Sequence, residues 1–406
     1  MADIFMPIKE RRDMDPSAVS ASELDEFRAT LRKFATDAFS AKAAYWDEEE
    51  KFPQENRDLL ARLGYLGLVI PEQYGGSGLS ILHATVFLEE ISRVCFNTGL
   101  VCQLAINGPS RAIEILGSEE QKNRFLPKCA SGEYMFGIGM SEPGAGSATT
   151  DMVTSALPDG DAYVLNGQKV FCTGGHLATH VLVFARFGKT SGANGIGALV
   201  VEKGMPGFEV GKPDRKMGGR GVAEAELFFD NCRVPRENLL MLGDEHSTRS
   251  FRVLMSSFGP ERVGNAAMCL GVAQGAFELA VAYSKERPQF GRPICEFQGI
   301  QWKIADMATQ IHATRLMVHH AATHLEDGFP NPLAAAQAKL YANEMVQRVT
   351  NEALQIHGHY GFTRDFPLER MVRDSRGFAL GGGTVEILRN TIASIVYGRS
   401  FNQRRS

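Results

Sequence analysis

The chain has 406 residues, of which 44% are hydrophobic and 22% are charged, and its formal net charge is −4. This length exceeds the usual limit for one hydrophobic core, so two or three packed units are expected. The weak negative charge gives no reason to expect nucleic-acid binding, and no apolar run is long enough to predict a membrane span.

Seven cysteines are scattered along the chain without a C-x-x-C pair or a cysteine–histidine ladder. This pattern predicts reduced thiols and no zinc or other metal site. The first fifteen residues, MADIFMPIKERRDMD, lack the apolar core of a signal peptide and contain acidic residues that argue against a transit peptide. A cytoplasmic location is therefore expected.

The first third of the chain has the residue spacing of helices. After about twenty polar residues, which predict an irregular arm, Ser22 can cap a helix whose apolar residues recur every three or four positions. Further predicted helices cover residues 82–94 and 99–116, and the next is expected to be interrupted by Pro127. Residues 1–133 are thus predicted to form a helical N-terminal domain.

The middle of the chain has short β-branched and aromatic runs bounded by Gly, Asp, Asn and Pro. The predicted strands cover residues 134–140, 162–172, 179–187, 196–203 and 225–235. No helical pattern alternates with them, so a doubly wound nucleotide-binding fold is not expected. Residues 134–247 are predicted to form a β-barrel or β-sandwich domain.

The last third of the chain is again helical. The predicted long helices cover residues 263–279 and beyond up to Pro288, 297–316 and beyond, 333–357 and 384–397. Four helices of this length predict a C-terminal four-helix bundle over residues 248–406. The fold class predicted for the whole chain is α+β.

Two glycine-ended stretches in the β region are the strongest signal of a binding site. The sequence GIGMSEPGAGSATT (137–150) begins as a buried strand and breaks at Pro143, after which residues 144–147 allow a ligand to approach the backbone closely. The stretch QKVFCTGG (168–175) repeats this design with an aromatic and a hydroxyl residue. Together they predict two strands whose ends converge on one planar ligand.

These stretches, followed by RPQFG, RDFPLERMVRD and GGGT, resemble the acyl-CoA dehydrogenase flavoproteins over nearly the whole chain. The resemblance implies a helical N-terminal domain, a central β domain and a C-terminal bundle. It also implies FAD between the β domain and the bundle, with an acyl-CoA thioester against the flavin. The expected assembly is a homotetramer built as a dimer of dimers, and the expected electron acceptor is an electron-transfer flavoprotein.

The same resemblance assigns the cofactor contacts. Around the isoalloxazine ring it implies Ile138, Met140, Ser141, Phe171 and Thr173. For the pyrophosphate and adenine of a neighbouring subunit's FAD it implies Arg287, Gln289, Phe290, Gln298, Gln355, Gly358 and His359. At the N-terminus of the last helix, Thr384 and Glu386 would face polar groups of the flavin.

Two of these positions, 171 and 359, and the nearby position 174 depart from the usual residues of the family. Phe171 stands where a tryptophan is usual, which keeps an aromatic wall. Gly174 stands where an asparagine is usual, and His359 replaces a glycine. The contact at His359 would survive only if the backbone angles there suit a side chain.

The catalytic base is the main departure. Most family members carry the glutamate just before the Gly-Thr pair of the C-terminal motif, where this chain has Gly382. A minority branch, which includes the isovaleryl-CoA and long-chain enzymes, carries it at the start of the long bundle helix, where Glu261 stands. The resemblance therefore implies that Glu261 removes the α proton, while the backbone N–H of Gly382 helps to polarise the thioester carbonyl.

The predicted substrate contacts are Ser147, Phe258, Arg262, Gly381 and Gly383. Arg262 would contact the CoA portion and Ser147 the thioester arm. Since glycines remove bulk beside the reacting carbons, a branched or bulky acyl group is predicted.

Two alternatives stay open at this stage. One is an acyl-CoA desulfinase, reductase or oxidase on the same scaffold, and the other is a non-catalytic protein that binds flavin or CoA esters. Ala148, where the family usually has aspartate, is similar to desulfinase-type members. Those enzymes work without a glutamate base, so Glu261 argues against that reading.

Overall fold

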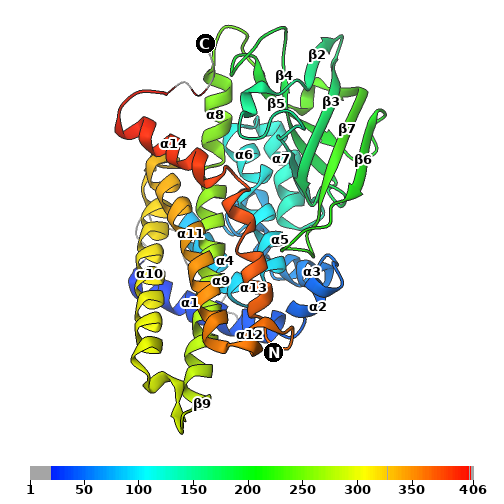
Figure 1. Ribbon diagram of the computed structural model, residues 1–406. Helices are drawn as coiled ribbons and strands as arrows, with labels where there is room; N and C mark the ends of the chain where they lie inside the picture. The colour runs from blue at the N-terminus through cyan, green and yellow to red at the C-terminus, as the bar shows by residue number, and fades with distance from the viewer. Residues whose placement is uncertain (1–19, 327, 402, 404–406) are drawn as a thin grey trace.

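A computed structural model describes residues 20–326, 328–401 and 403. Within these residues, seven α-helices precede an eight-stranded sheet, and seven further α-helices follow it (Figure 1). This order of helical, sheet and helical parts confirms the predicted fold class. The predicted N-terminal arm lies outside the described residues except for Ser20, which caps the first helix through a reciprocal pair of hydrogen bonds with Glu23. The cap is therefore Ser20 and not Ser22.

The N-terminal helices contain two corrections to the predicted boundaries. Their bounds are α1 Ala21–Phe39, α2 Ala43–Glu48, α3 Gln54–Arg62, α4 Ile81–Val94, α5 Phe96–Asn107, α6 Pro109–Leu116 and α7 Glu119–Ala130. The helix predicted over residues 99–116 is two helices, because Pro109 lacks the N–H that would continue α5 and begins α6 instead. Pro127 does not interrupt α7, since it lies in the last turn, where one missing N–H is tolerated.

The central sheet contains every predicted strand and three more. The strands are β1 Phe136–Gly139, β2 Ser155–Asp159, β3 Ala162–Thr173, β4 His180–Arg186, β5 Ile196–Glu202, β6 Phe208–Pro213, β7 Glu224–Pro235 and β8 Leu239–Met241. They lie in the order β6-β7-β3-β2-β4-β5-β8, and β1 pairs in parallel with β4. The additional strands β2, β6 and β8 are short, and β2 and β6 are largely exposed, so they lack the apolar alternation that marks the others.

The sheet curls back on itself and is covered by helices on its other face. In β4, Val183 packs with Leu227 of β7, although β2 and β3 separate these strands in the sheet. The neighbouring Leu182 and Phe184 point the opposite way and pack with Phe125 of α7. This two-sided burial explains why β4 has almost no polar residues, and it confirms a barrel-like or sandwich-like domain.

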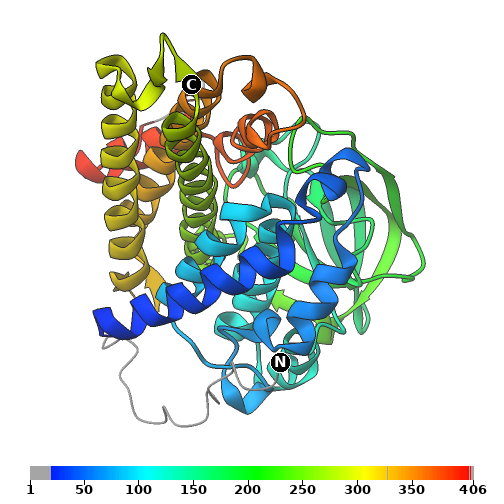
Figure 2. The ribbon, with the colours of Figure 1, turned by 90° about the horizontal axis from the view of Figure 1, so that it is seen from below.

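The C-terminal helices form a layer beside the sheet (Figures 1 and 2). Their bounds are α8 Arg249–Ser257, α9 Gly259–Glu286, α10 Gln298–Thr323, α11 Pro332–His357, α12 His359–Phe362, α13 Leu368–Asp374 and α14 Val385–Val396. The long helices α9, α10 and α11 pack on one another, α4 of the N-terminal part packs on α9, and α14 packs on α11. A short hairpin, β9 Pro288–Gln289 with β10 Arg292–Pro293, joins α9 to α10.

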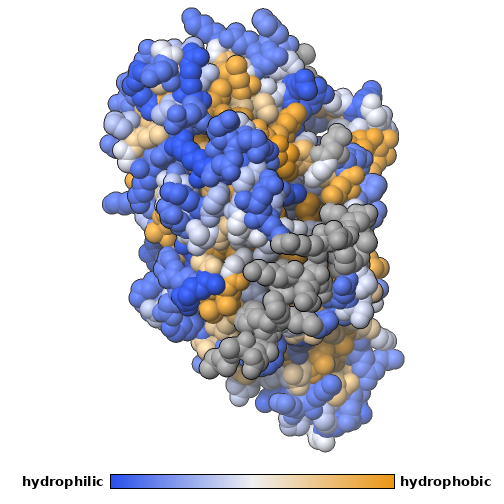
Figure 3. Space-filling model, turned by 180° about the vertical axis from the view of Figure 1, so that it is seen from behind, coloured by the Kyte–Doolittle hydropathy of each residue, from blue (hydrophilic) through white to orange (hydrophobic). Residues whose placement is uncertain are grey.

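One helical stretch has the length and apolar composition of a membrane span, contrary to the expectation from the sequence. It covers Arg249–Glu286, and 61% of its most apolar window is buried inside the fold. Its apolar character is that of a core helix, because α9 is surrounded by α4, α10 and α11. On the face opposite to Figure 1, the described apolar residues form separated patches between polar ones (Figure 3).

Candidate active site

The loop after β1 is held by a buried ion pair that the sequence motifs did not reveal. Lys169 of β3 is fully buried, and its Nζ donates to Glu142 Oε1 (2.7 Å) and to the Met140 carbonyl (3.2 Å). Glu142 also accepts the main-chain N–H groups of Val153 (2.6 Å) and Thr154 (3.0 Å). Burial lowers the pKa of Lys169 to about 8, although Glu142 opposes this shift. Through Glu142, the loop that carries Ser141 is therefore tied both to Lys169 of β3 and to the main chain at residues 153 and 154.

Ser141 lies beside the exposed aromatic residue of β3. The carbonyl of Ser141 accepts a hydrogen bond from the N–H of Val170 (2.9 Å), and Phe171 follows with a positive φ of 57° at an irregularity in the β3–β7 pairing. This rare backbone conformation turns the ring out of the sheet, so that 65% of it is exposed between buried neighbours. The structure thus places Ser141 beside the exposed Phe171, with Thr173 at the end of the same strand, and a planar ligand could contact this edge.

The replacement at Gly174 has a backbone explanation. Its φ is +66°, a conformation that glycine and asparagine adopt more readily than other residues. A Cβ atom at Gly174 would lie 2.7 Å from the Cε of Met135 and 3.5 Å from Leu104. Glycine therefore suits both the backbone angle and the close approach of Met135 in this chain.

A second group of predicted cofactor residues lines an open pocket at the end of the long helices. Arg287, Gln289, Phe290, Gly358 and His359 line this pocket, whose volume is about 440 Å³. The other lining residues are Tyr283, Ile294, Phe297, Ile300, Ile356, His357 and Tyr360. Of the other predicted residues, Gln298 begins α10 and Gln355 lies in the last turn of α11. Neither is part of the pocket lining.

Two features of this pocket suit a nucleotide with phosphates. The Arg287 guanidinium lies 5.6 Å from the centre of the Tyr360 ring and forms no ion pair with a described carboxylate, so its charge is available to an anion. Phe290 projects from the β9–β10 hairpin with 93% of its surface exposed. His359 begins α12, and the positive φ of 60° falls on Gly358, so the side chain at 359 meets no backbone obstacle.

The two groups of cofactor residues are far apart within one chain. Figures 1 and 2 show the β9–β10 hairpin at the end of α9 and α10 remote from the sheet, whereas Phe171 belongs to β3 and Ser141 lies in the loop after β1. The surface at Ser141 and Phe171 and the arginine pocket suit the two ends of FAD by their chemistry. They can serve one FAD molecule only if two chains contribute to it.

Glu261 lies in the first turn of α9, half-buried at the junction with α5. Its carbonyl accepts a hydrogen bond from Gln103 Nε2 (2.8 Å), and Gln103 also donates to Asn265 Oδ1 (3.0 Å). Burial raises the pKa of the Glu261 carboxyl, while Arg262 and Lys339 counteract part of that effect. A carboxylate with a raised pKa is suited to accept a proton near neutral pH.

The glycine loop lies next to Glu261 and cannot easily carry a base itself. Gly382 has a φ of +66°, and a Cβ atom there would lie 2.8 Å from Asn265 Nδ2 and 3.5 Å from Lys339 Nζ. A glutamate at 382 would thus require both strain and displacement. Asn265 and Lys339 interact with Glu261 as well, so the structure brings the two predicted catalytic positions together.

The predicted substrate residues differ in their surroundings. Ser147, Gly381 and Gly383 are exposed. Arg262 is half-buried, and its guanidinium donates no hydrogen bond within the described part of the chain. Phe258 is only 4% exposed and packs 5.7 Å from Phe184, which gives its ring a packing role in the core. At the remaining cofactor positions, Thr384 caps α14 and Glu386 lies in its first turn.

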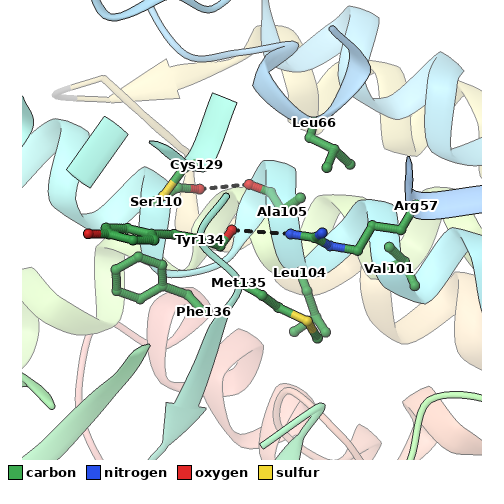
Figure 4. Close-up of a pocket in the computed structure, with 10 residues that line it drawn as sticks. All are labelled: Arg57, Leu66, Val101, Leu104, Ala105, Ser110, Cys129, Tyr134, Met135 and Phe136. Carbon is green, nitrogen blue, oxygen red and sulfur yellow. Dashed lines mark hydrogen bonds between the residues drawn. The ribbon is translucent and has the colours of Figure 1, made fainter. Parts of the chain in front are cut away.

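A small cavity lies between α5, α7 and β1 (Figure 4). The Arg57 guanidinium points into it and donates to the carbonyls of Gly132 (2.6 Å) and Tyr134 (3.4 Å). The cavity volume is about 20 Å³, enough for a single water molecule but not for an acyl chain. Within the described ranges, no group of three or more His, Cys, Asp and Glu residues could hold a metal ion.

The comparisons with known proteins cover all three parts of the chain. Residues 21–133, 137–232 and 249–397 match the sequence models of the N-terminal, middle and C-terminal domains of acyl-CoA dehydrogenases. The chain is 38% identical over 375 residues to the short-chain-specific acyl-CoA dehydrogenase of Clostridium acetobutylicum, covering 92% of this chain and 98% of the relative. It is 41% identical over 384 residues to the 3-sulfinopropanoyl-CoA desulfinase of Paraburkholderia xenovorans, covering 94% and 97%.

The solved structure of butyryl-CoA dehydrogenase from Megasphaera elsdenii shares the fold with a TM-score of 0.88 at 33% identity, covering 95% of this chain and 100% of that one. The surface at Ser141 and Phe171 and the pocket at Arg287 lie on this scaffold, and their chemistry suits the two ends of FAD. The chain therefore belongs to the acyl-CoA dehydrogenase family of FAD-dependent oxidoreductases.

Proposed function

We propose that this protein catalyses the α,β-dehydrogenation of an acyl-CoA thioester. The observation that carries the proposal is the position of Glu261, a carboxyl of raised pKa beside the glycine loop in which the usual base is absent. Glu261 takes the proton from the α carbon, and the N–H of Gly382 donates to the thioester carbonyl. The residues around Ser141 and Phe171 would hold the flavin of FAD, which would supply the acceptor for the hydride that leaves the β carbon.

The remaining predicted contacts bind and orient the substrate and cofactor. Ser147 and Arg262 would hold the thioester arm and the CoA portion, and Gly381 leaves space for a branch or ring on the acyl group. The proposed substrate class is therefore a branched or bulky acyl-CoA, with an electron-transfer flavoprotein as acceptor. Turnover of straight and branched thioesters with equal kcat/KM would contradict the choice of substrate class.

The experiment that tests the function is an anaerobic titration of the purified yellow protein with CoA thioesters. The panel includes straight, methyl-branched, aromatic and dicarboxylic acyl groups, and the flavin absorption band is followed. Bleaching by the branched or aromatic class supports the proposal. A yellow protein that none of the thioesters bleaches would contradict dehydrogenation. No reduction of a purified electron-transfer flavoprotein would then be observed, because the flavin would carry no electrons from the substrate.

We propose that the protein assembles as a homotetramer in which each FAD is shared between two chains. The support is the separation of the two groups of cofactor residues within one chain. Arg287→Met is expected to weaken FAD binding about tenfold or more, because a charge-assisted bond to phosphate contributes about 1.5–3 kcal/mol. Equilibrium dialysis of FAD against the apoprotein measures the change.

Arg292→Met is the matched control for this prediction. Arg292 lies on the same hairpin, but its guanidinium stacks 4.3 Å from the centre of the Phe297 ring and it is about half exposed. Its replacement should leave the affinity for FAD within about twofold of the natural protein, since it contributes no donor to the pocket. Equal loss of FAD in both variants would show that the hairpin charge as a whole, and not Arg287, binds the cofactor.

A second function is favoured by Ala148 and by the 41% identity to a desulfinase. In that case 3-sulfinopropanoyl-CoA would release sulfite without bleaching the flavin, and Glu261→Gln would not affect the release.

We also propose domain boundaries near residues 134 and 248 and a cytoplasmic location, the latter in keeping with seven free cysteines.

A further inference from the structure

Lys339 of α11 is a completely buried lysine that forms no ion-pair contact with a carboxylate in the described part of the chain. Its Nζ donates to the main-chain carbonyls of Gly381 (2.6 Å), Gly383 (2.7 Å) and Phe378 (3.2 Å). An ammonium group has three donors, so these carbonyls satisfy it fully. Burying a charged lysine costs free energy unless its donors are satisfied. Here the three hydrogen bonds that satisfy it also fix one specific conformation of the glycine loop.

This clamp determines the direction of one N–H group. In a trans peptide the C=O and the following N–H point in opposite directions. Because the carbonyl of Gly381 points inward to Lys339, the N–H of Gly382 points outward, on the exposed side of the loop. Within the described residues no hydrogen-bond acceptor pairs with that N–H. It is therefore a free, oriented donor next to Glu261.

Lys339 also belongs to the electrostatic surroundings of Glu261. The titratable groups that interact with it are Glu261, Arg262 and Cys269, all on α9. Burial lowers the pKa of Lys339 to about 8, against the raising effect of Glu261. In return, the positive charge of Lys339 lowers the pKa of the Glu261 carboxyl, which burial alone would raise further.

We propose that Lys339 is a positioning residue for the dehydrogenation: it orients the Gly382 N–H toward the thioester carbonyl and contributes a positive charge to the surroundings of the Glu261 carboxyl. This inference rests on the proposed function. A single buried ammonium thereby couples the group that polarises the carbonyl to the group that removes the proton. The oriented N–H stabilises the enolate-like charge that develops on the carbonyl oxygen, and the carboxyl accepts the α proton only in its ionised form.

The first test is the pH dependence of Lys339→Met, a neutral side chain of similar length. We expect kcat to fall about tenfold or more, with the acid limb of the kcat/KM profile moved upward by about one pH unit, because the charge that favours the ionised carboxyl is gone. A residue that only supports folding would lower the amount of active protein without moving that limb. An unmoved limb together with kcat within twofold of the natural protein would overturn the inference.

The second test measures binding without turnover. A 2-enoyl-CoA product and its thioether analogue, which lacks the carbonyl oxygen, are titrated against the flavin band at equilibrium. The natural protein should bind the thioester more tightly than the thioether. In Lys339→Met this preference should shrink about tenfold, since the oriented N–H no longer faces the carbonyl. An unchanged preference would contradict the orienting role.

The matched control is Lys169→Met, at another lysine that is fully buried in the described part of the chain. Lys169 holds the Ser141 loop, so its loss should raise the Kd for FAD and leave the acid limb of the remaining holoenzyme in place. A shift of the limb in both variants would assign it to general loosening of the fold and overturn the electrostatic part of the inference.

A third variant decides the case if Lys339→Met does not fold. Lys339→Arg keeps the charge but cannot aim one nitrogen at three converging carbonyls, so kcat should fall about tenfold with an unmoved acid limb. Natural kcat in Lys339→Arg would overturn the inference. Failure of the proposed function is recognised separately, because the natural protein would then bleach with none of the thioesters.

Discussion

Glu261→Gln is expected to lower kcat about a thousandfold while the protein remains folded and yellow. General bases contribute roughly 10²–10⁴ to the rate, and an amide cannot accept the α proton. The substitution keeps the size of the side chain and its neighbours Gln103 and Asn265, so FAD retention should not change. Stopped-flow bleaching of the flavin under anaerobic conditions measures the reduction step directly.

The pH profile gives an independent check of this prediction. The folded pKa of Glu261 is raised by burial, so the carboxyl is protonated and inactive below that value and ionised above it. The acid limb of kcat/KM should therefore be present in the natural protein and absent from the residual activity of Glu261→Gln. A limb that persists would place the base elsewhere.

Glu119→Gln is the control for the ordinary role of a glutamate at a helix start. Glu119 is in the first turn of α7 and contacts Lys122 (2.8 Å) and Tyr74 (2.8 Å) at the surface. Its replacement removes a favourable helix-dipole interaction but no catalytic group, so kcat should stay within about twofold. Comparable losses in both variants would mean that Glu261 acts through helix stability.

Arg373→Met is expected to destabilise the fold by about 3–5 kcal/mol, because it leaves the buried charge of Asp47 without a partner. Asp47 of α2 is 1% exposed, and the Arg373 guanidinium donates to both of its oxygens (2.6 and 3.1 Å). The same guanidinium donates to Glu369 and to the carbonyl of Met217. One side chain of α13 thus joins the N-terminal helices, the β domain and the C-terminal helices. The midpoint of urea unfolding, followed by far-UV circular dichroism, measures the loss.

Asp47→Asn in the Arg373→Met background separates the two contributions to this loss. Removing the unpaired charge should recover part of the stability, since an amide is less costly to bury than a carboxylate. If the double variant is instead less stable than Arg373→Met by the full effect of Asp47→Asn alone, the two residues act independently. A natural urea midpoint in Arg373→Met would contradict the predicted role of the pair.

Local patterns in the sequence determined the order of the three parts, the strands β1, β3, β4, β5 and β7, and the long helices. These elements are the ones in which apolar residues recur at a regular period, so burial of one face selects their conformation. The motifs also led to Glu261 through the glycine at 382. Boundaries were less secure where a single residue competes with the pattern, as at Pro109 and Pro127.

The tertiary structure alone decided which polar residues are buried and what they contact. Lys339 and Lys169 look like ordinary charged residues in the sequence, although Lys339 shares the three- and four-residue spacing of Ala342 and Val346 on the buried face of α11. Their partners are carbonyls or a carboxylate from loops that are 27 to 44 positions away in the chain. Such partners carry no periodic signal, because main-chain carbonyls are common to every residue. The orientation of the Gly382 N–H follows from those contacts, and so only the folded chain reveals it.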